Sequence, residues 1–556
     1  MRKVILLIFS FASLFLGAAD LPDNMYFQAM KDEMQRTHKQ LKVKASAPVF
    51  FTVYKLTDVF RHQVSSSLGA ALPEEEPANY LSALVYMYAG NGKKNSSGFV
   101  PAATSGDNRY EFAPESSSFV PQSYEGIRRE LWKLTDNAYI FASSAYDKKQ
   151  AYKKRKGLTD PLPEFSKTKR AVFRQEIPAF QPLPSDTQKM LDRISEQGKK
   201  LPYLERFIVR RERLQNRYYF LDSEQDFAQY YVPQDYVHLQ ALFRGKDGRR
   251  YNLMRSYNLT EKEQNQPAQI QQWAEEILAQ VQEQYQAVKM EKPYIGPVLF
   301  EKKAAADFFF FLFYPSARYS KPLLRGDDAT DAAAGYFKDR IGMRVISPLF
   351  DVFDRPLLTH YQDTALPAFM PIDDEGVQTQ DLQLVQEGKL LALPTLRSPI
   401  EGQKKSNGHA RANVFSAPRA GLTNLIFVPK QVLSAKQMEE KLLERCKELD
   451  LEYGYIINSS FDYWKGKGWP GPVQRIYTKD GRREPVSGIE LAGLSARSLR
   501  TILAAGDKQY VFGNFSAYQT RGASAVSIVA PSILVDEIEL DKDSLAHRVT
   551  QHLLHS

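Results

Sequence analysis

Residues 294–317 read YIGPVLFEKKAAADFFFFLFYPSA and mark a change of character along a chain of 556 residues. Just before this stretch, residues 269–285 carry apolar side chains at helical spacing, which predicts an amphipathic helix. After it the sequence favours strands, and Asp480-Gly481 between two β-favouring runs is typical of a hairpin turn. We therefore place the main domain boundary between residues 293 and 294.

The composition and the element pattern together predict an α+β protein of two large domains. Hydrophobic residues make up 43% and charged residues 25%, a balance that excludes a mostly disordered or fibrous chain. We expect a mixed α/β N-terminal domain over residues 20–293, with helices at residues 25–41 and 124–156. The C-terminal domain, residues 294–556, is expected to be rich in antiparallel sheet.

Finer features of the sequence predict individual strands and one helix cap. Residues 48–60 and 61–70 are interpreted as two strands, and residues 524–540 as a strand that Pro531 interrupts. Ser434 is expected to cap a helix, with Gln437 three residues later as its capping-box partner.

The first nineteen residues have the layout of a secretory signal peptide. Arg2 and Lys3 precede an uncharged apolar run over residues 4–16, and residues 17–19 supply the small side chains of a cleavage site. A retained membrane anchor is the alternative, but the run is shorter than the ~20 residues that a spanning helix needs. We expect cleavage after residue 19 and export to the periplasm or the cell exterior, with no stable membrane span afterwards.

The charge balance bears on the class of partner. Lys and Arg outnumber Asp and Glu by 74 to 65, a net charge of +9 that loses two units with the signal peptide. An exported chain with this modest excess is not expected to bind nucleic acid. The basic run at residues 148–156, with Tyr146 and Tyr152, admits two interpretations: a polyanion-binding patch, or a helix end whose cations complement the helix dipole. We favour the second.

The sequence shows no familiar catalytic constellation. Its eight histidines form no His-Glu-x-x-His pattern, and there is no Gly-x-Ser-x-Gly elbow. The one cysteine, Cys446, excludes an intramolecular disulfide. It shares a predicted helix face with Met438 and Leu442, so we interpret it as a core residue. Acidic runs such as residues 373–375 are typical of turns.

Several segments in shared order resemble the TldD/PmbA family of metallopeptidase-related proteins, also called modulators of DNA gyrase. The resemblance looks closest to the exported, TldD-related branch that carries a signal peptide. It is found in residues 29–34, 48–56, 64–70, 131–139, 163–166, 296–301, 304–306, 373–377, 406–411, 418–424, 491–506 and 531–540.

The resemblance implies where an active relative would hold its zinc. Active members carry His-Glu-x-x-x-His on a helix after the Gly-Pro-Val-Leu segment, and a cysteine near the C-terminus completes the site. In this chain those positions fall on Phe310, Phe311 and Pro315, with the cysteine position near Ala517. Phenylalanine cannot bind zinc, and we expect the proline to end the helix. We therefore expect no catalytic residue, no metal and no cofactor in this chain, and zinc only in active relatives.

The resemblance also implies a partner, because the family precedent pairs a metal-bearing chain with a metal-free one. We expect this chain to take the metal-free role as a peptide-binding or partner subunit, in a homo- or heterodimer with a TldD/PmbA-like chain. Two alternatives remain open: an active peptidase with a rewired site around His360 and His409, or a purely structural envelope protein. The candidate peptide-contacting residues are Asp374, Glu375, His409, Arg411 and Arg419, whose alternative role is to stabilise turns and hairpins.

Overall fold

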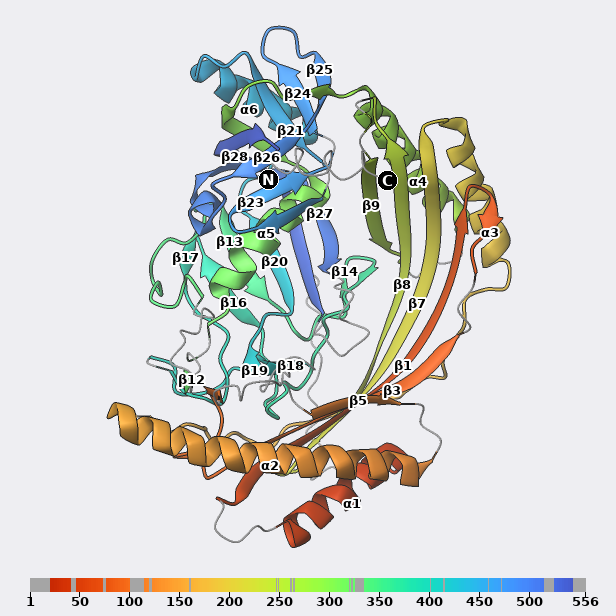
Figure 1. Cartoon of the computed structure of the whole chain (residues 1–556). Helices are drawn as coiled ribbons and strands as arrows, with labels where there is room; N and C mark the ends of the chain where they lie inside the picture. Colours follow the sequence, from red (N-terminus) through yellow and green to blue (C-terminus); the bar gives the residue numbers. More distant parts are fainter. Residues whose placement is uncertain are drawn as a thin grey trace, which may run out of the picture.

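A computed structural model describes residues 21–41, 47–73, 77–100, 115–119, 123–159, 162–246, 248, 250–260, 263, 266–319, 321, 324–325, 335–400, 402–413, 416–458, 460–471, 473–514 and 525–543. The expected signal peptide lies outside these residues. Within them, no helix is both long enough and apolar enough to span a bilayer. The chain has an α+β fold built on two large sheets (Figure 1).

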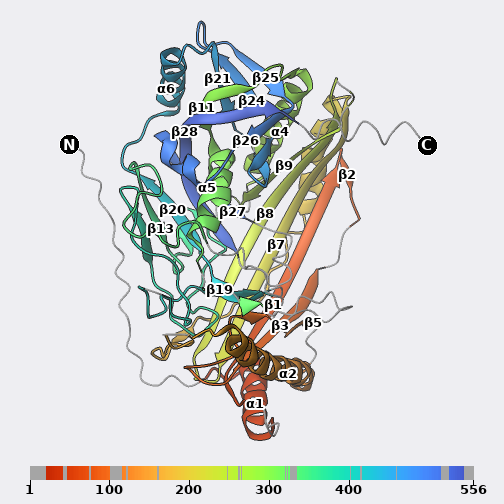
Figure 2. The ribbon, with the colours of Figure 1, turned by 60° about the vertical axis from the view of Figure 1, so that its left-hand side comes forward.

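The first sheet has eight strands, and its three central strands are unusually long. β1, β7 and β8 contain 19, 19 and 18 residues and run the length of the molecule (Figures 1 and 2). The strand order is β5 (Glu115–Phe119), β3 (Ala78–Ala89), β1 (Val49–Ser67), β7 (Leu204–Asp222), β8 (Phe227–Arg244) and β6 (Val172–Arg174), with β2 (Ala70–Ala71) beside β1 and β9 (Arg250–Asn258) beside β8.

Two pairs of helices cover one face of this sheet at opposite ends. Because side chains alternate across a strand, Phe207 and Tyr219 of β7 lie on the same face. Phe207 packs in the cluster beneath α3 (Thr187–Glu196) and α4 (Pro267–Gln286), whereas Tyr219 packs in the cluster beneath α1 and α2. α1 (Met25–Gln40) and α2 (Tyr124–Lys156) lie together at the far end of the strands (Figure 2).

The second sheet has fourteen strands and is mainly antiparallel. Three pairings are parallel: β10 with β25, β11 with β21, and β20 with β28. The main path is β10 (Val288–Lys289), β25 (Arg483–Ser487), β24 (Val473–Tyr477), β21 (Tyr453–Ile457), β11 (Tyr294–Phe300), β28 (Val526–Lys542), β20 (Asn424–Pro429), β13 (Phe350–Asp354), β16 (Leu382–Gln386) and β17 (Lys389–Leu390), with β22 (Phe461–Trp464), β23 (Lys467–Pro470), β26 (Ile489–Ala492) and β27 (Ile502–Asn514) attached.

Smaller elements complete the described part of the chain. Two short hairpins project from the second half: β14 (His360–Tyr361) with β15 (Thr364–Ala365), and β18 (Ala410–Asn413) with β19 (Ser416–Ala420). The remaining elements are β4 (Phe99–Val100) paired with β12 (Leu324–Arg325), the helices α5 (Lys302–Ala317) and α6 (Ala435–Glu448), and the 3-10 turns Gln197–Lys200 and Ala496–Thr501.

The predicted helices are confirmed. α1, α2 and α4 lie where the sequence indicates, and Ser434 and Gln437 form the expected capping box at the start of α6. Cys446 is fully buried beside Met438 and Leu442, and burial raises the pKa of its thiol to about 11. It is a core residue, as predicted.

Three expectations about chain breaks are wrong. Residues 49–67 form one strand rather than two, because no turn residue separates Phe60 from Arg61. β28 also continues through Pro531, which stands opposite Gln509 beside a shift in the β27 register, where the missing N–H is tolerated. α5 does not end at Pro315 but continues to Ala317.

Candidate functional site

Helix α5 occupies the place where the family resemblance locates a zinc site. It starts two residues after β11 and packs against β28. Phe308, Phe309 and Phe313 are fully buried in the core of the second half. The core interpretation of this phenylalanine run therefore holds for these three rings.

The two phenylalanines at the implied ligand positions face other aromatic rings. Phe310 stacks on Tyr314 with ring centroids 5.3 Å apart, and Phe311 stacks on Tyr463 at 5.2 Å. Both phenylalanines are half-buried, and Pro315 is exposed. The fourth implied position, Ala517, lies outside the described residues.

These residues do not fit a zinc ion. Phenylalanine and proline side chains supply no donor atom, whereas zinc sites are built from His, Cys, Asp and Glu. The nearest carboxylate, Asp307, accepts hydrogen bonds from Ser460 Oγ at 2.6 Å and from Lys303. No group of three or more His, Cys, Asp or Glu in the described part of the chain is arranged to hold a metal. We derive no metal-dependent step for this chain.

The turn at residues 373–376 joins the two halves of the molecule, and we call it the domain joint. Asp374 Oδ1 accepts a hydrogen bond from Lys55 Nζ of β1 at 2.6 Å, and its Oδ2 accepts one from the amide of Ala412 at 2.7 Å. Glu375 accepts from the Tyr88 hydroxyl of β3 at 3.1 Å and from the Arg397 amide at 2.7 Å. Burial raises the pKa of Glu375.

Arg397 reinforces the domain joint from the second half. It is 1% exposed, and its Nη1 donates to Glu224 Oε2 at 2.8 Å. Its Nε donates to the Ser166 carbonyl at 2.9 Å, and its guanidinium lies 3.9 Å from the centroid of the Phe165 ring. A buried arginine that is paired and stacked in this way fixes the orientation of both partners.

A pair of carboxyl groups lies directly beneath the domain joint. Asp222 and Asp226 belong to the turn between β7 and β8, and both are 1% exposed. Burial raises the pKa of Asp226 to about 6, and burial together with the charge of Asp226 raises that of Asp222 well above its usual value. Gly376 lies close to this pair, since a Cβ added there would lie 2.2 Å from Asp222 Oδ2.

The other predicted contact residues lie on or beside the hairpin of β18 and β19. His409 is fully buried, with its Nδ1 3.0 Å from the Asn407 carbonyl and its Nε2 3.2 Å from Asp354. Arg411 and Arg419 pair across the hairpin, and Arg411 Nη2 donates to the Ala525 carbonyl at 2.9 Å. These contacts and those of Asp374 and Glu375 fit the alternative of turn and hairpin stabilisation, and their contact with a peptide stays a prediction.

A cavity of about 570 Å³ lies where the two halves meet, along the edge of β8 that faces away from β7. We call it the edge cavity. β6 pairs with β8 only at residues 227–229, and β9 pairs with it only at residues 236–244. The stretch between them, residues 230–235, forms an unfilled gap along the edge of β8. Hairpin β14–β15 borders this gap, and Asn258 of β9 donates to the Ala365 carbonyl at 2.7 Å.

Five amide side chains contribute to the wall of the edge cavity. Gln215 accepts from the Tyr231 hydroxyl at 2.8 Å and is 2% exposed. Asn258 Oδ1 is buried, and none of the described residues donates to it. The lining consists of Gln175, Gln181, Arg213, Gln215, Tyr231, Val232, Pro233, Gln234, Asp235, Asn258, Leu259, Thr359, His360, Ala365, Leu366 and Phe369.

The backbone of β8 offers acceptors to this cavity. The Tyr231 amide donates to Gln175 Oε1 at 3.1 Å, away from β7. In an antiparallel strand the N–H and C=O of one residue point to the same side, so the Tyr231 carbonyl points into the gap. The Pro233 carbonyl, two residues on, points the same way.

Comparison with known proteins identifies the second half of the chain. Residues 293–542 match the family model described as the PmbA/TldA metallopeptidase C-terminal domain. Residues 293–542 therefore form a TldD/PmbA-family C-terminal domain. A search of curated proteins finds no match.

Solved structures share the fold of this chain over nearly its whole length. TldE from Thermococcus kodakarensis is 14% identical, with a TM-score of 0.59, and the match covers 92% of this chain and 99% of that one. A proposed modulator of DNA gyrase from Thermotoga maritima MSB8 is 12% identical, with a TM-score of 0.57 and coverage of 93% and 100%. Another from Bacteroides thetaiotaomicron VPI-5482 is 11% identical, with a TM-score of 0.56 and coverage of 93% and 98%.

Sequence reasoning missed most of the edge cavity. Of the residues singled out beforehand, only His360 lines it, and the structure separates that exposed side chain from the buried His409. Pro233 was the available signal, because a proline within a long strand pattern marks an edge. The basic run of α2 also proved partly internal, since Lys149 pairs with Glu164 at 2.9 Å and is 3% exposed.

Proposed function

We propose that this TldD/PmbA-family protein is an exported, metal-free subunit that binds an extended peptide in the edge cavity. The observation that carries the proposal is the gap at residues 230–235 of β8, which opens into a cavity of about 570 Å³. A peptide added to such an edge is held by main-chain hydrogen bonds and needs no catalytic side chain.

The lining of the cavity suits a peptide backbone of many sequences. The carbonyls of Tyr231 and Pro233 accept peptide N–H groups, and the Asn258 Oδ1 atom, buried without a donor, accepts another. Neutral amides can bond to either polar group of a peptide unit. Binding is therefore expected to depend weakly on the peptide's charge and side chains.

The expected partner is a relative that keeps the metal ligands. The aromatic side chains on α5 leave this chain without donors at the implied site, so cleavage of a bound peptide requires a second chain. We propose a dimer in which this subunit holds the peptide and a TldD/PmbA-like partner cleaves it.

Filling the cavity tests peptide binding. Ala365 lines the cavity and is half-buried, so Ala365→Trp places a large ring in the space that the peptide would use. We expect at least a tenfold rise in Kd, about 1.4 kcal/mol, for a fluorescein-labelled mixed-sequence nonapeptide pool followed by fluorescence anisotropy. Leu391→Trp, at an exposed position outside the cavity, should leave Kd unchanged. Equal affinity in both variants would refute this site.

Metal analysis separates the proposal from its alternatives. Protein purified without chelators is expected to contain less than stoichiometric zinc and to leave peptides uncut. Co-expression with a relative that keeps His-Glu-x-x-x-His is expected to yield a complex that cuts them. Stoichiometric zinc with hydrolysis by the chain alone would establish the rewired peptidase instead. If the chain neither binds peptides nor forms a complex, the remaining alternative is a purely structural envelope protein.

A further inference from the structure

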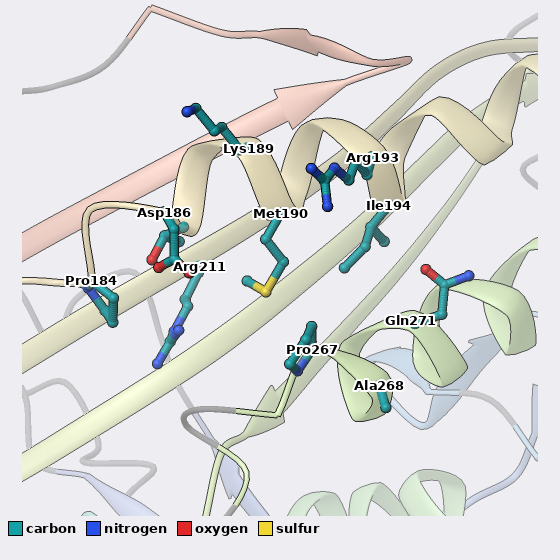
Figure 3. Close-up of a pocket in the computed structure, with 11 residues that line it drawn as sticks. Pro184, Asp186, Lys189, Met190, Arg193, Ile194, Arg211, Pro267, Ala268 and Gln271 are labelled. Atoms are coloured by element: carbon teal, nitrogen blue, oxygen red, sulfur yellow. The ribbon is translucent and has the colours of Figure 1, made fainter.

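A second cavity has a volume of about 580 Å³ and lies between α3, the first turn of α4 and β7 (Figure 3). We call it the helix cavity. Its charged lining residues are the three cations Lys189, Arg193 and Arg211 and one acid, Asp186. Its apolar lining comes from Pro184, Met190, Ile194, Pro267 and Ala268. A volume of this size is typical of a small-molecule site.

Arg211 is the buried cation of this cavity. It is 2% exposed, and its Nε and Nη2 both bind the carboxylate of Asp235 at 2.9 Å. This leaves the N–H groups of Nη1 on the other edge of the planar guanidinium. Figure 3 shows the Arg211 side chain extending from β7 on the side of the cavity where Pro184 and Asp186 lie. A charge held in this way is fixed in direction before any ligand arrives.

The start of α3 adds an uncapped helix end and an unpartnered hydroxyl to this lining. The N-cap residue Asp186 makes no side-chain hydrogen bond to the first turn, so the amides of that turn, at the helix end that favours negative charge, have no side-chain cap. The Asp186 carboxylate itself repels an anion, so it is not one of the binding groups. Thr187 lines the cavity and is 2% exposed, and its Oγ1 has no hydrogen-bond partner among the described residues. A buried hydroxyl of this kind is costly unless something bonds to it.

The exposed cation Arg193 completes the arrangement. It lines the cavity one turn after Met190, and no described residue forms an ion pair with it. Figure 3 shows Met190 projecting from α3 towards Pro267, with Arg211 on one side of it and Arg193 on the other. The cavity therefore combines fixed positive charge with apolar surface.

We propose that the helix cavity binds a small organic anion, with its phosphate or carboxylate group at Arg211 and Arg193 and its apolar body against Met190 and Pro267. The two acidic groups share the chemistry that guanidinium groups recognise, namely planar or tetrahedral oxygens that accept paired N–H donors. This inference is independent of peptide binding in the edge cavity.

Titration with model anions tests the proposal. Phenyl phosphate and benzoate, at constant ionic strength, are expected to bind with saturation in calorimetry, and the tighter of the two identifies the acidic group. Inorganic phosphate is expected to bind at least fivefold more weakly, because it lacks the apolar body. Benzamidine, a cation of similar shape, is expected not to bind. A linear response to every anion would overturn the proposal.

Site assignment needs a signal from the cavity itself. With ¹³C-methyl methionine, the Met190 resonance, assigned by Met190→Leu, is expected to shift on titration. The exposed Met343 is the internal control. Arg193→Gln is expected to weaken binding at least fivefold, whereas Lys436→Gln, an exposed change on α6, should have no effect. Unchanged affinity in Arg193→Gln, or shifts at Met343 alone, would place the anion elsewhere.

Discussion

Asp222 and Asp226 are buried carboxyl groups close enough to perturb each other, and this makes the fold sensitive to pH. Burial raises both pKa values, and the charge of Asp226 raises that of Asp222 further. For Asp226, the charge of Glu224 also raises the pKa, whereas hydrogen bonds from the Ala171 amide and with Asp222, and the charge of Arg397, lower it. Asp222 Oδ1 accepts the amides of Glu224 and Asp226 at 2.9 Å. Its Oδ2 has no partner among the described residues, which suits a proton on that oxygen.

The pair binds its proton more tightly in the folded state than in the unfolded one. It therefore stabilises the fold in acid, and this contribution is lost as the pH rises through about 6. Asp222→Asn keeps the accepting Oδ1 and carries a permanent donor in place of the proton. Between pH 5 and 7.5 we expect the unmodified protein to lose about 1–2 kcal/mol of unfolding free energy that the variant keeps.

Urea denaturation across that pH range measures this difference. Asp339→Asn, whose side chain is 83% exposed, is the matched control and should follow the unmodified protein. Parallel stability profiles for Asp222→Asn and the unmodified protein would show that the pair ionises normally.

Among the elements, the turn at residues 373–376 shows how closely the two halves approach. Gly376 has a φ of +76°, a conformation that side chains with a Cβ rarely adopt, and an added Cβ would lie 2.2 Å from Asp222 Oδ2 and 3.0 Å from Asp226 Oδ2. Gly376→Ala is expected to lower the unfolding free energy by about 2–3 kcal/mol, through backbone strain and displacement of Asp222. Thermal unfolding of Gly376→Ala and of Gly402→Ala measures the effect. Gly402 has a φ of +78° but open space at its Cβ position, so it isolates the strain alone.

Local patterns predicted the helices well, because helical periodicity and capping depend on residues that are close together in the sequence. The capping box at Ser434 and the buried face with Cys446 are examples. The errors at Pro315 and Pro531 share a cause: proline disfavours a helix or strand interior, but surrounding packing kept both elements continuous. α5 is anchored by the buried Phe308, Phe309 and Phe313 before Pro315 and by the buried Ala317 after it, which residue preferences alone do not reveal.

The candidate sites depend on contacts that sequence does not encode locally. The edge cavity combines the consecutive strands β7, β8 and β9 with a hairpin from the second half, whose Ala365 lies 107 positions beyond Asn258 of β9. Lys55 and Asp374, 319 positions apart, likewise meet only in the fold. The acidic run at residues 373–375 was correctly expected in a turn, but its burial between two sheets could not be predicted.

At the scale of the whole molecule, the pair Lys55–Asp374 helps to hold the two sheets together. The side chains are 18% and 4% exposed, so removing the lysine leaves a buried Asp374 charge whose remaining donor, among the described residues, is the Ala412 amide at Oδ2. Lys55→Met is expected to lower the unfolding free energy by about 2–3 kcal/mol and to separate the calorimetric transition into two.

A double variant distinguishes loss of the pair from loss of packing. Lys55→Met with Asp374→Asn removes the uncompensated charge and is expected to recover about half of the lost stability. Lys436→Met, on the exposed face of α6, should leave a single transition. A single transition in Lys55→Met would mean that the remaining contacts of the domain joint suffice to couple the halves.

The length of β1, β7 and β8 has a consequence for how the N-terminal half loses its structure. At ~3.3 Å per residue, nineteen residues extend about 60 Å, and the same three strands carry one helix pair at each end. If these strands separate at one end, the backbone hydrogen bonds that continue beneath the other helix pair are weakened as well. Slow amide hydrogens beneath α1 and beneath α4 should therefore exchange with a common free energy, as one cooperative unit.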